Sequence, residues 1–186
     1  MTYVRLEPPA RSAGAYTVRS IAREDMESIR RWRNAQMGVL RQAAKISAAE
    51  QERYFDVAVE PTFALQRPRQ ILLTLLEDGT PIGYGGLTNL DWDARRAELS
   101  FLVAPERVAR PDVYERDFRA FLELAVDGVA LRDLNLHRVF AETYDVRPHH
   151  VSILEAFGFV AEGRMRDHVR VDGRYVDSLL HGYVAR

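Results

Sequence analysis

The sequence predicts an α+β domain in which helices pack on a mixed, mostly antiparallel sheet. Some segments carry apolar residues at helical spacing, whereas others alternate or run apolar over five to ten residues. Turn signals such as Glu77-Asp78-Gly79-Thr80 and Asp172-Gly173 separate the second kind of segment. In order, the chain reads as a strand, two helices, a three-strand meander, a helix, a strand, a helix and a hairpin, which is typical of α+β proteins.

Local signals place each element. Strands are expected at residues 15–21, 70–76, 81–89, 97–103, 137–144, 159–171 and 175–184. Helices are expected from residue 23, from residue 48, over 112–131 and over 151–157. The string Ser47-Ala48-Ala49-Glu50 is a capping box for the second helix, which Pro61 should end. Pro111 suits the first turn of the third helix, in which Gly128 is the weak point, and Gly158 ends the last one.

Composition limits the classes of protein. A length of 186 residues suits one domain, expected over residues 15–186, after a polar and flexible N-terminal arm at residues 1–14. The net charge of −1 gives no basic field for nucleic acid. The absence of cysteine excludes disulfides, thiolate zinc sites and a cysteine nucleophile, and we expect no metal. No signal peptide or membrane-length apolar run is present, so a cytoplasmic protein without membrane contact is expected.

Four strings carry a family resemblance: Pro81–Leu87, Ala97–Val103, Arg138–Thr143, and Leu154–Phe159 followed by Glu162-Gly163. In order and spacing they resemble the third, fourth and fifth strands and the ending of the GNAT superfamily of N-acetyltransferases, over nearly the whole chain. The resemblance implies a GNAT-like central sheet, mixed and mostly antiparallel, with helices on both faces. It also implies acetyl-CoA as co-substrate and a primary amine as acceptor.

The resemblance further implies where the cofactor lies. In the family, the fourth and fifth strands splay apart, and the pantetheine arm lies in the gap like an added strand. Backbone groups at Leu99, Phe101, Leu102 and Val103 would then hold the arm, and a backbone N–H there would stabilise the oxyanion.

The family's glycine-rich pyrophosphate loop corresponds here to residues 105–112, which contain no glycine. We expect Arg107 and Arg110 to bind the phosphates by charge, against the opposing charges of Glu106 and Asp112. The tyrosine that many members use to protonate the leaving thiolate falls at Leu154, so an acid must come from elsewhere.

Several residues are candidates for proton transfer. Glu98 and Glu142 lie in the two strands that would flank the reaction centre, and a carboxylate there could act as base. Strand alternation places Glu98 on one face with Ser100 and Leu102, opposite Leu99 and Phe101. The alternative for either glutamate is an edge position paired with an arginine. His149 and His150 are further candidates for proton transfer, or alternatively surface histidines at a helix start. Tyr144 is a candidate for the acid that protonates the thiolate, or alternatively a half-buried aromatic at the end of a strand.

Trp32-Arg33-Asn34 resembles the opening of a GNAT branch that includes ribosomal-protein-alanine and nucleotide-amino-sugar N-acetyltransferases. These residues are expected to form an acceptor wall, or alternatively one turn of an amphipathic helix with a core Trp. His168, near His181 across the terminal hairpin, is a further acceptor candidate or part of a polar sheet face. The expected acceptor is a nucleotide-linked amino sugar. The alternatives are a protein N-terminus, a small amine or antibiotic, and a non-catalytic binding protein. A homodimer is compatible with the sequence, which does not determine the oligomeric state.

Overall fold

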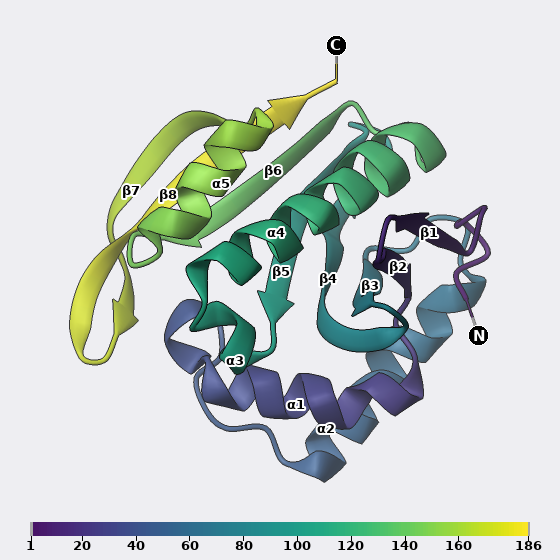
Figure 1. The fold of residues 1–186 in the computed structure, drawn as a ribbon, viewed down its shortest axis with the longest axis horizontal. Helices are drawn as coiled ribbons and strands as arrows, with labels where there is room; N and C mark the ends of the chain where they lie inside the picture. Colours follow the sequence, from purple (N-terminus) through teal and green to yellow (C-terminus); the bar gives the residue numbers. More distant parts are fainter. Residues whose placement is uncertain (1, 186) are drawn as a thin grey trace.

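The computed structural model describes residues 2–185 and contains one eight-stranded sheet (Figure 1). The strand order is β1-β2-β3-β4-β5-β6-β8-β7, and every neighbouring pair is antiparallel except β5 with β6. The strands are β1 (Ala10–Ala13), β2 (Tyr16–Ser20), β3 (Ile71–Glu77), β4 (Thr80–Asp91), β5 (Arg96–Val103), β6 (Arg138–Tyr144), β7 (Val160–Val171) and β8 (Arg174–Val184). The predicted α+β class with a mostly antiparallel sheet is confirmed.

The helices follow the capping signals of the sequence. They are α1 (Met26–Ala35), α2 (Ala48–Tyr54), α3 (Pro105–Val108), α4 (Pro111–Leu122) and α5 (Pro148–Phe157), with 3-10 turns at Arg23–Asp25, Met37–Val39 and Glu60–Ala64 and π-helical turns at Phe55–Val59 and Glu123–Asp133. Ser47 and Glu50 form the predicted capping box, and Gly158 ends α5 at a φ of 119°. Pro61 does not end its helix at once, because it begins a 3-10 turn where no amide donor is needed.

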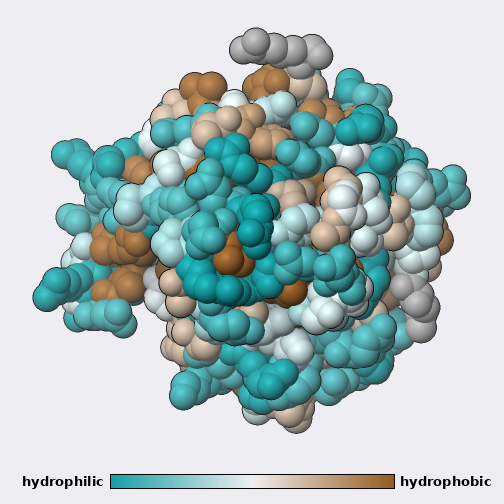
Figure 2. Space-filling model, in the orientation of Figure 1, coloured by the Kyte–Doolittle hydropathy of each residue, from teal (hydrophilic) through white to brown (hydrophobic). Residues whose placement is uncertain are grey.

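The two faces of the sheet are covered by different helices. Figure 1 shows α4 and α5 across the near face, where Phe101 of β5 stacks on Phe118 of α4 with ring centroids 4.6 Å apart. On the other face, Arg33 of α1 donates to the hydroxyl of Tyr84 of β4 at 2.7 Å. Outside these layers the surface is mainly polar, and Figure 2 shows its apolar side chains in small separate groups.

The N-terminal residues differ from the expected flexible arm. Tyr3 is fully buried, and its hydroxyl accepts a hydrogen bond from the Leu72 amide at 3.0 Å. Leu6 is also buried in the core, and residues 10–13 form β1 at the edge of the sheet. The segment differs from the expectation because two apolar side chains within a polar segment are enough to anchor it, and two residues are too few to establish a helix or strand period.

The pairing between β5 and β6 covers only a few residues, and the point where it ends determines where the cavity lies. These strands pair only where Arg96–Glu98 lies beside Arg138–Phe140, and beyond that point they separate. The remainder of β5 pairs on its other edge with β4, where the close approach leaves no room for a side chain at Gly83 or Gly85. One edge of β5, from Leu99 onward, is therefore not paired with β6.

Candidate active site

A cavity of about 440 Å³ lies at the separation of β5 and β6. Its walls come from both faces of the sheet. Glu98, Ser100 and Glu142 line it with side chains from the α1 side, while Phe118 and His150 line it from the α4 and α5 side. The cavity thus connects the two layers through the gap between the strands, and a substrate on each side can meet the other there.

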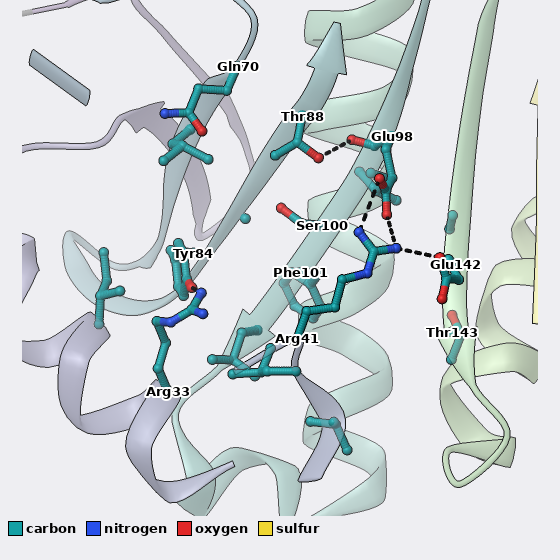
Figure 3. Close-up of a pocket in the computed structure, with 18 of the residues that line it drawn as sticks. Arg33, Arg41, Gln70, Tyr84, Thr88, Glu98, Ser100, Phe101, Glu142 and Thr143 are labelled. Atoms are coloured by element: carbon teal, nitrogen blue, oxygen red, sulfur yellow. Dashed lines mark hydrogen bonds and ion pairs between the residues drawn. The ribbon is translucent and has the colours of Figure 1, made fainter. Parts of the chain in front are cut away.

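The α1 side of the cavity contains a carboxylate pair held by one guanidinium (Figure 3). Arg41 Nη2 lies 2.9 Å from Glu98 Oε1 and 2.5 Å from Glu142 Oε2. Asn89 Nδ2 also donates to Glu98 Oε2 at 2.6 Å, and Asn89 is oriented by a strand irregularity at which its φ is 49°. The two glutamates come from different strands, and their side chains are only 10% and 14% exposed. Both expected base candidates therefore line one pocket and share one arginine.

The α4 side of the cavity contains a hydrogen-bonded chain of three side chains. The hydroxyl of Tyr114 lies 2.7 Å from Nδ1 of His150 and accepts from Nη2 of Arg147 at 2.5 Å. The imidazole stacks on Phe118 with centroids 4.3 Å apart. Burial, reinforced by the neighbouring Arg147 charge, lowers the pKa of His150 well below 6.5, so this imidazole is neutral. Burial likewise raises the pKa of Tyr114, so its hydroxyl stays protonated.

The stretch expected to bind pyrophosphate folds into the short helix α3. The amides of Arg107, Ala109 and Arg110 all donate to carbonyl groups within residues 104–107, so these amides are not available to a phosphate. Arg107 donates to Asp117 at 2.5 and 2.8 Å and to Glu77 at 2.7 Å. Its side chain is only 11% exposed, and its contacts hold the loop to α4. Arg107 is therefore engaged in ion pairs within the protein and is not free to bind phosphate as expected. Arg110, in contrast, is exposed at the start of α4.

The expected cofactor-arm residues lie on the unpaired part of β5. Leu99, Phe101 and Leu102 line the cavity. Val103 is fully buried, and its carbonyl already accepts a hydrogen bond from Gln36 Nε2 at 2.8 Å. This end of the strand is therefore less available than the expectation assumed.

Of the three residues expected to form the acceptor wall, one lines the cavity and two hold the surrounding structure in place. Arg33 lines the cavity. Trp32 lies in the hydrophobic core, as the amphipathic-helix alternative requires. Asn34 exchanges hydrogen bonds of 2.8 Å with the backbone of Ile46 and accepts from Gln42 at 2.9 Å, so it fixes the connection between α1 and α2.

The remaining candidates divide in the same way. Tyr144 lines the cavity, whereas His149 is exposed with Nε2 3.2 Å from the Pro111 carbonyl. His168 Nε2 lies 3.8 Å from Glu142 at the cavity rim. The expected approach of His168 to His181 is wrong, because the hairpin register pairs His181 with Ala161 and the imidazole is buried near Glu155.

Sequence reasoning missed four residues at this site, one of which is Arg147 at the start of α5. Tyr114 occupies a core position of α4, and Asn89 gives only a turn signal. Arg41 lies between a 3-10 turn and α2, where no periodicity marks it. With arginine so abundant in the chain, its type gave no signal either.

Two further properties concern residues 2–185. No group of three or more histidine, aspartate or glutamate side chains there is arranged to hold a metal ion. None of the helices in this part of the chain is both long and apolar enough to cross a membrane.

Comparison with known proteins agrees with this architecture. The family model for the acetyltransferase (GNAT) domain matches residues 18–180. The spermidine N(1)-acetyltransferase of Vibrio cholerae serotype O1 is 29% identical over 96 residues, which are 52% of each protein, so the alignment spans about half the length of that relative.

Solved structures show the same fold. The crystal structure of spermidine N-acetyltransferase from Vibrio cholerae in complex with CoA and spermine has a TM-score of 0.74 at 20% identity, covering 91% of this chain and 95% of that chain. A dodecameric structure of spermidine N-acetyltransferase from Vibrio cholerae in an intermediate state also has a TM-score of 0.74 at 20% identity, covering 91% and 94%. This chain belongs to the GNAT acetyltransferase family, the acetyl-CoA-dependent N-acetyltransferases.

Proposed function

We propose that this protein transfers the acetyl group of acetyl-CoA to a primary amine of a small cationic acceptor such as a polyamine. The observation that carries the proposal is the pair of carboxylates, Glu98 and Glu142, at the separation of β5 and β6. An alkylammonium group is attracted to such a pair, and a carboxylate can take the proton that the amine must lose before it attacks.

The reaction then runs across the gap. The neutral amine nitrogen bonds to the acetyl carbonyl carbon, and the oxyanion is stabilised by a backbone N–H on the unpaired edge of β5. When the carbon–sulfur bond breaks, the second proton of the attacking nitrogen passes to the thiolate. Glu98 and Glu142 act on the acceptor side, and His150 lies on the opposite wall, where the pantetheine arm would enter.

For the phosphates of acetyl-CoA, the supporting residues are Arg110 and Arg147. Arg110 is exposed at the start of α4, where the helix dipole favours an anion, and Arg147 lies at the start of α5 beside Tyr114. Within residues 2–185, the Arg147 side chain donates a hydrogen bond to a neutral hydroxyl and forms no ion pair, so its charge remains available to a phosphate. Two arginine side chains would thus compensate for the amides that α3 uses within its own turn.

The choice of a cationic acceptor rests on charge. Of the cavity-lining arginines on the α1 side, Arg33 is bonded to the uncharged Tyr84 and Gln42, and Arg41 to the two glutamates. A nucleotide-linked amino sugar, the acceptor expected from the sequence, brings a pyrophosphate that Glu98 and Glu142 would repel on this side, where Arg33 alone of these two arginines is not paired with a carboxylate. The named relative, a spermidine N(1)-acetyltransferase, supports a polyamine instead.

The test is a thiol-release assay with acetyl-CoA and four acceptors: spermidine, putrescine, a nucleotide-linked 4-amino sugar and a peptide with a free N-terminus. We expect turnover with the polyamines above the others. One of the two glutamates is expected to be the base, so either Glu98→Gln or Glu142→Gln should lower kcat about 100-fold or more. Glu27→Gln, at an exposed position of α1, is the matched control and should keep full activity. Turnover of the amino sugar alone, or of none of the four, would contradict the proposal.

A further inference from the structure

The guanidinium of Arg41 occupies the centre of the carboxylate pair. One nitrogen, Nη2, is shared between Glu98 and Glu142, and a second, Nη1, lies 3.5 Å from Glu98 (Figure 3). This is the position that the ammonium of a cationic acceptor would take. The amine and Arg41 therefore cannot occupy the pair together in this arrangement.

Arg41 belongs to a connection rather than to the sheet. It lies between the 3-10 turn at Met37–Val39 and α2, in a segment without helix or strand. Asn34 fixes the far end of this connection at Ile46, and Gln42 is held by Asn34 and Arg33. Arg41 itself crosses to β5 and β6, so its ion pairs close the segment over the cavity.

Breaking the ion pairs costs the carboxylates more free energy than it costs Arg41. The carboxylates are largely buried, and removal of their cation would leave two negative charges near each other in a poorly solvated place, which is costly. Arg41 is 55% exposed, so its guanidinium can return to water at little cost. Another cation can therefore replace Arg41 between the two carboxylates, but loss of Arg41 without a replacement is unfavourable.

We propose that Arg41 is an internal occupant of the acceptor's ammonium site, and that the acceptor enters by replacing it. The 40–46 connection then acts as a gate that opens only for a ligand carrying its own positive charge. A neutral amine cannot replace the guanidinium without leaving the carboxylates unpaired. This inference rests on the proposed function, because it concerns the same pair of glutamates.

The exchange predicts the class of acceptor more narrowly. The pair has two negative charges, so a diamine or polyamine, with a second ammonium beside the reacting one, matches it better than a monoamine. Asn89 continues to hold Glu98 after Arg41 leaves, because its hydrogen bond does not involve the guanidinium. The acceptor thus meets a carboxylate that is already in position.

The test compares Arg41→Gln and Arg41→Lys with wild type in calorimetric titrations with spermidine, and in rate measurements over spermidine and acetyl-CoA. Removing an internal competitor raises the apparent affinity by the inverse of the fraction of molecules in which the site had been free. We expect Arg41→Gln to bind spermidine roughly 3- to 10-fold more tightly and to lower its KM, with the KM of acetyl-CoA unchanged, and Arg41→Lys to fall between. Arg31→Gln, 65% exposed on α1, is the control and should change neither.

A second readout does not depend on turnover. Spermidine added to wild type should speed amide hydrogen exchange across residues 38–46, because the gate loses its ion pairs. Equal or weaker spermidine binding by Arg41→Gln, or slower exchange in that segment, would overturn the gate even if wild type acetylates polyamines. Failure of every acceptor in the activity panel, with tighter spermidine binding by Arg41→Gln, would refute the proposed function but support the gate.

Discussion

The hydroxyl of Tyr114 lies 2.7 Å from Nδ1 of His150, and the direction of this hydrogen bond is coupled to the tautomer of the imidazole. Arg147 donates to the same hydroxyl, and we infer that the hydroxyl proton of Tyr114 points toward Nδ1 rather than toward the arginine. A neutral imidazole that accepts at Nδ1 carries its proton on Nε2. His150 therefore presents a hydrogen-bond donor, and it suits stabilisation of the thiolate or oxyanion better than the role of base, which the carboxylates can fill.

Tyr114→Phe should release this constraint without removing the imidazole. We expect kcat to fall about 10-fold, within the lower range for a positioned proton-transfer group, while the KM of the amine changes little. Nitrogen NMR of histidine-labelled protein should show the Nε2–H form in wild type and a mixture in the variant. An Nδ1–H imidazole in wild type would refute the assignment. Tyr175→Phe, at an exposed position on β8, is the matched control.

The lowered pKa of His150 should appear in the pH dependence of stability. In the unfolded chain this histidine titrates near 6.5, whereas in the folded protein it stays neutral to a much lower pH. Between these two pKa values the unfolded state binds more protons, so the free energy of unfolding decreases as pH falls below 6.5. The slope contributed by one group approaches about 1.4 kcal/mol per pH unit.

Denaturant unfolding between pH 7.5 and 5 measures this effect. The slope below pH 6.5 should be shallower in His150→Gln than in wild type. His137→Gln, at an exposed position, should keep the wild-type slope. Parallel slopes in wild type and His150→Gln would show that burial of this imidazole does not govern acid stability.

Arg107 is expected to act on stability rather than on catalysis. Its ion pair with the fully buried Asp117 fastens α3 to α4, and Tyr16 also donates to that carboxylate at 2.9 Å. Arg107→Gln should lower the free energy of unfolding by about 3 kcal/mol, because it leaves a buried charge without its cation. Thermal unfolding should show a decrease of roughly 6 to 12 °C in Tm, against almost none for the exposed Arg110→Gln. An equal effect of the two variants would contradict this division.

The elements and the carboxylates were predictable, because their signals are local or periodic. The capping box at Ser47 and the glycine after α5 define helix ends within a few residues. The alternation of β5 placed Glu98 on the face away from Phe101, and family order placed Glu142 across the gap. Both findings follow from period and topology.

The contacts that decide the chemistry were not predictable. Arg41 meets glutamates 57 and 101 residues away, and no spacing rule relates a loop side chain to partners at such a separation. The absence of glycine from residues 105–112 predicted a changed phosphate site, which stays a prediction. It did not indicate that one helical turn would consume the amides or that Asp117 would bind Arg107.

Phosphate binding by side chains rather than by a backbone cradle gives the last prediction. Calorimetric titration with acetyl-CoA and with desulfo-CoA should show binding of both by wild type, because the sulfur is remote from the phosphates. Arg110→Gln and Arg147→Gln should each weaken binding roughly 10-fold, as expected for loss of one charge-assisted hydrogen bond. Higher salt should reduce the wild-type affinity more than that of either variant. Arg132→Gln, at an exposed position in the turn after α4, is the control. If wild type binds both ligands and neither arginine variant weakens the affinity, the phosphates are held elsewhere, and the glycine-free α3 turn must bind them in another way.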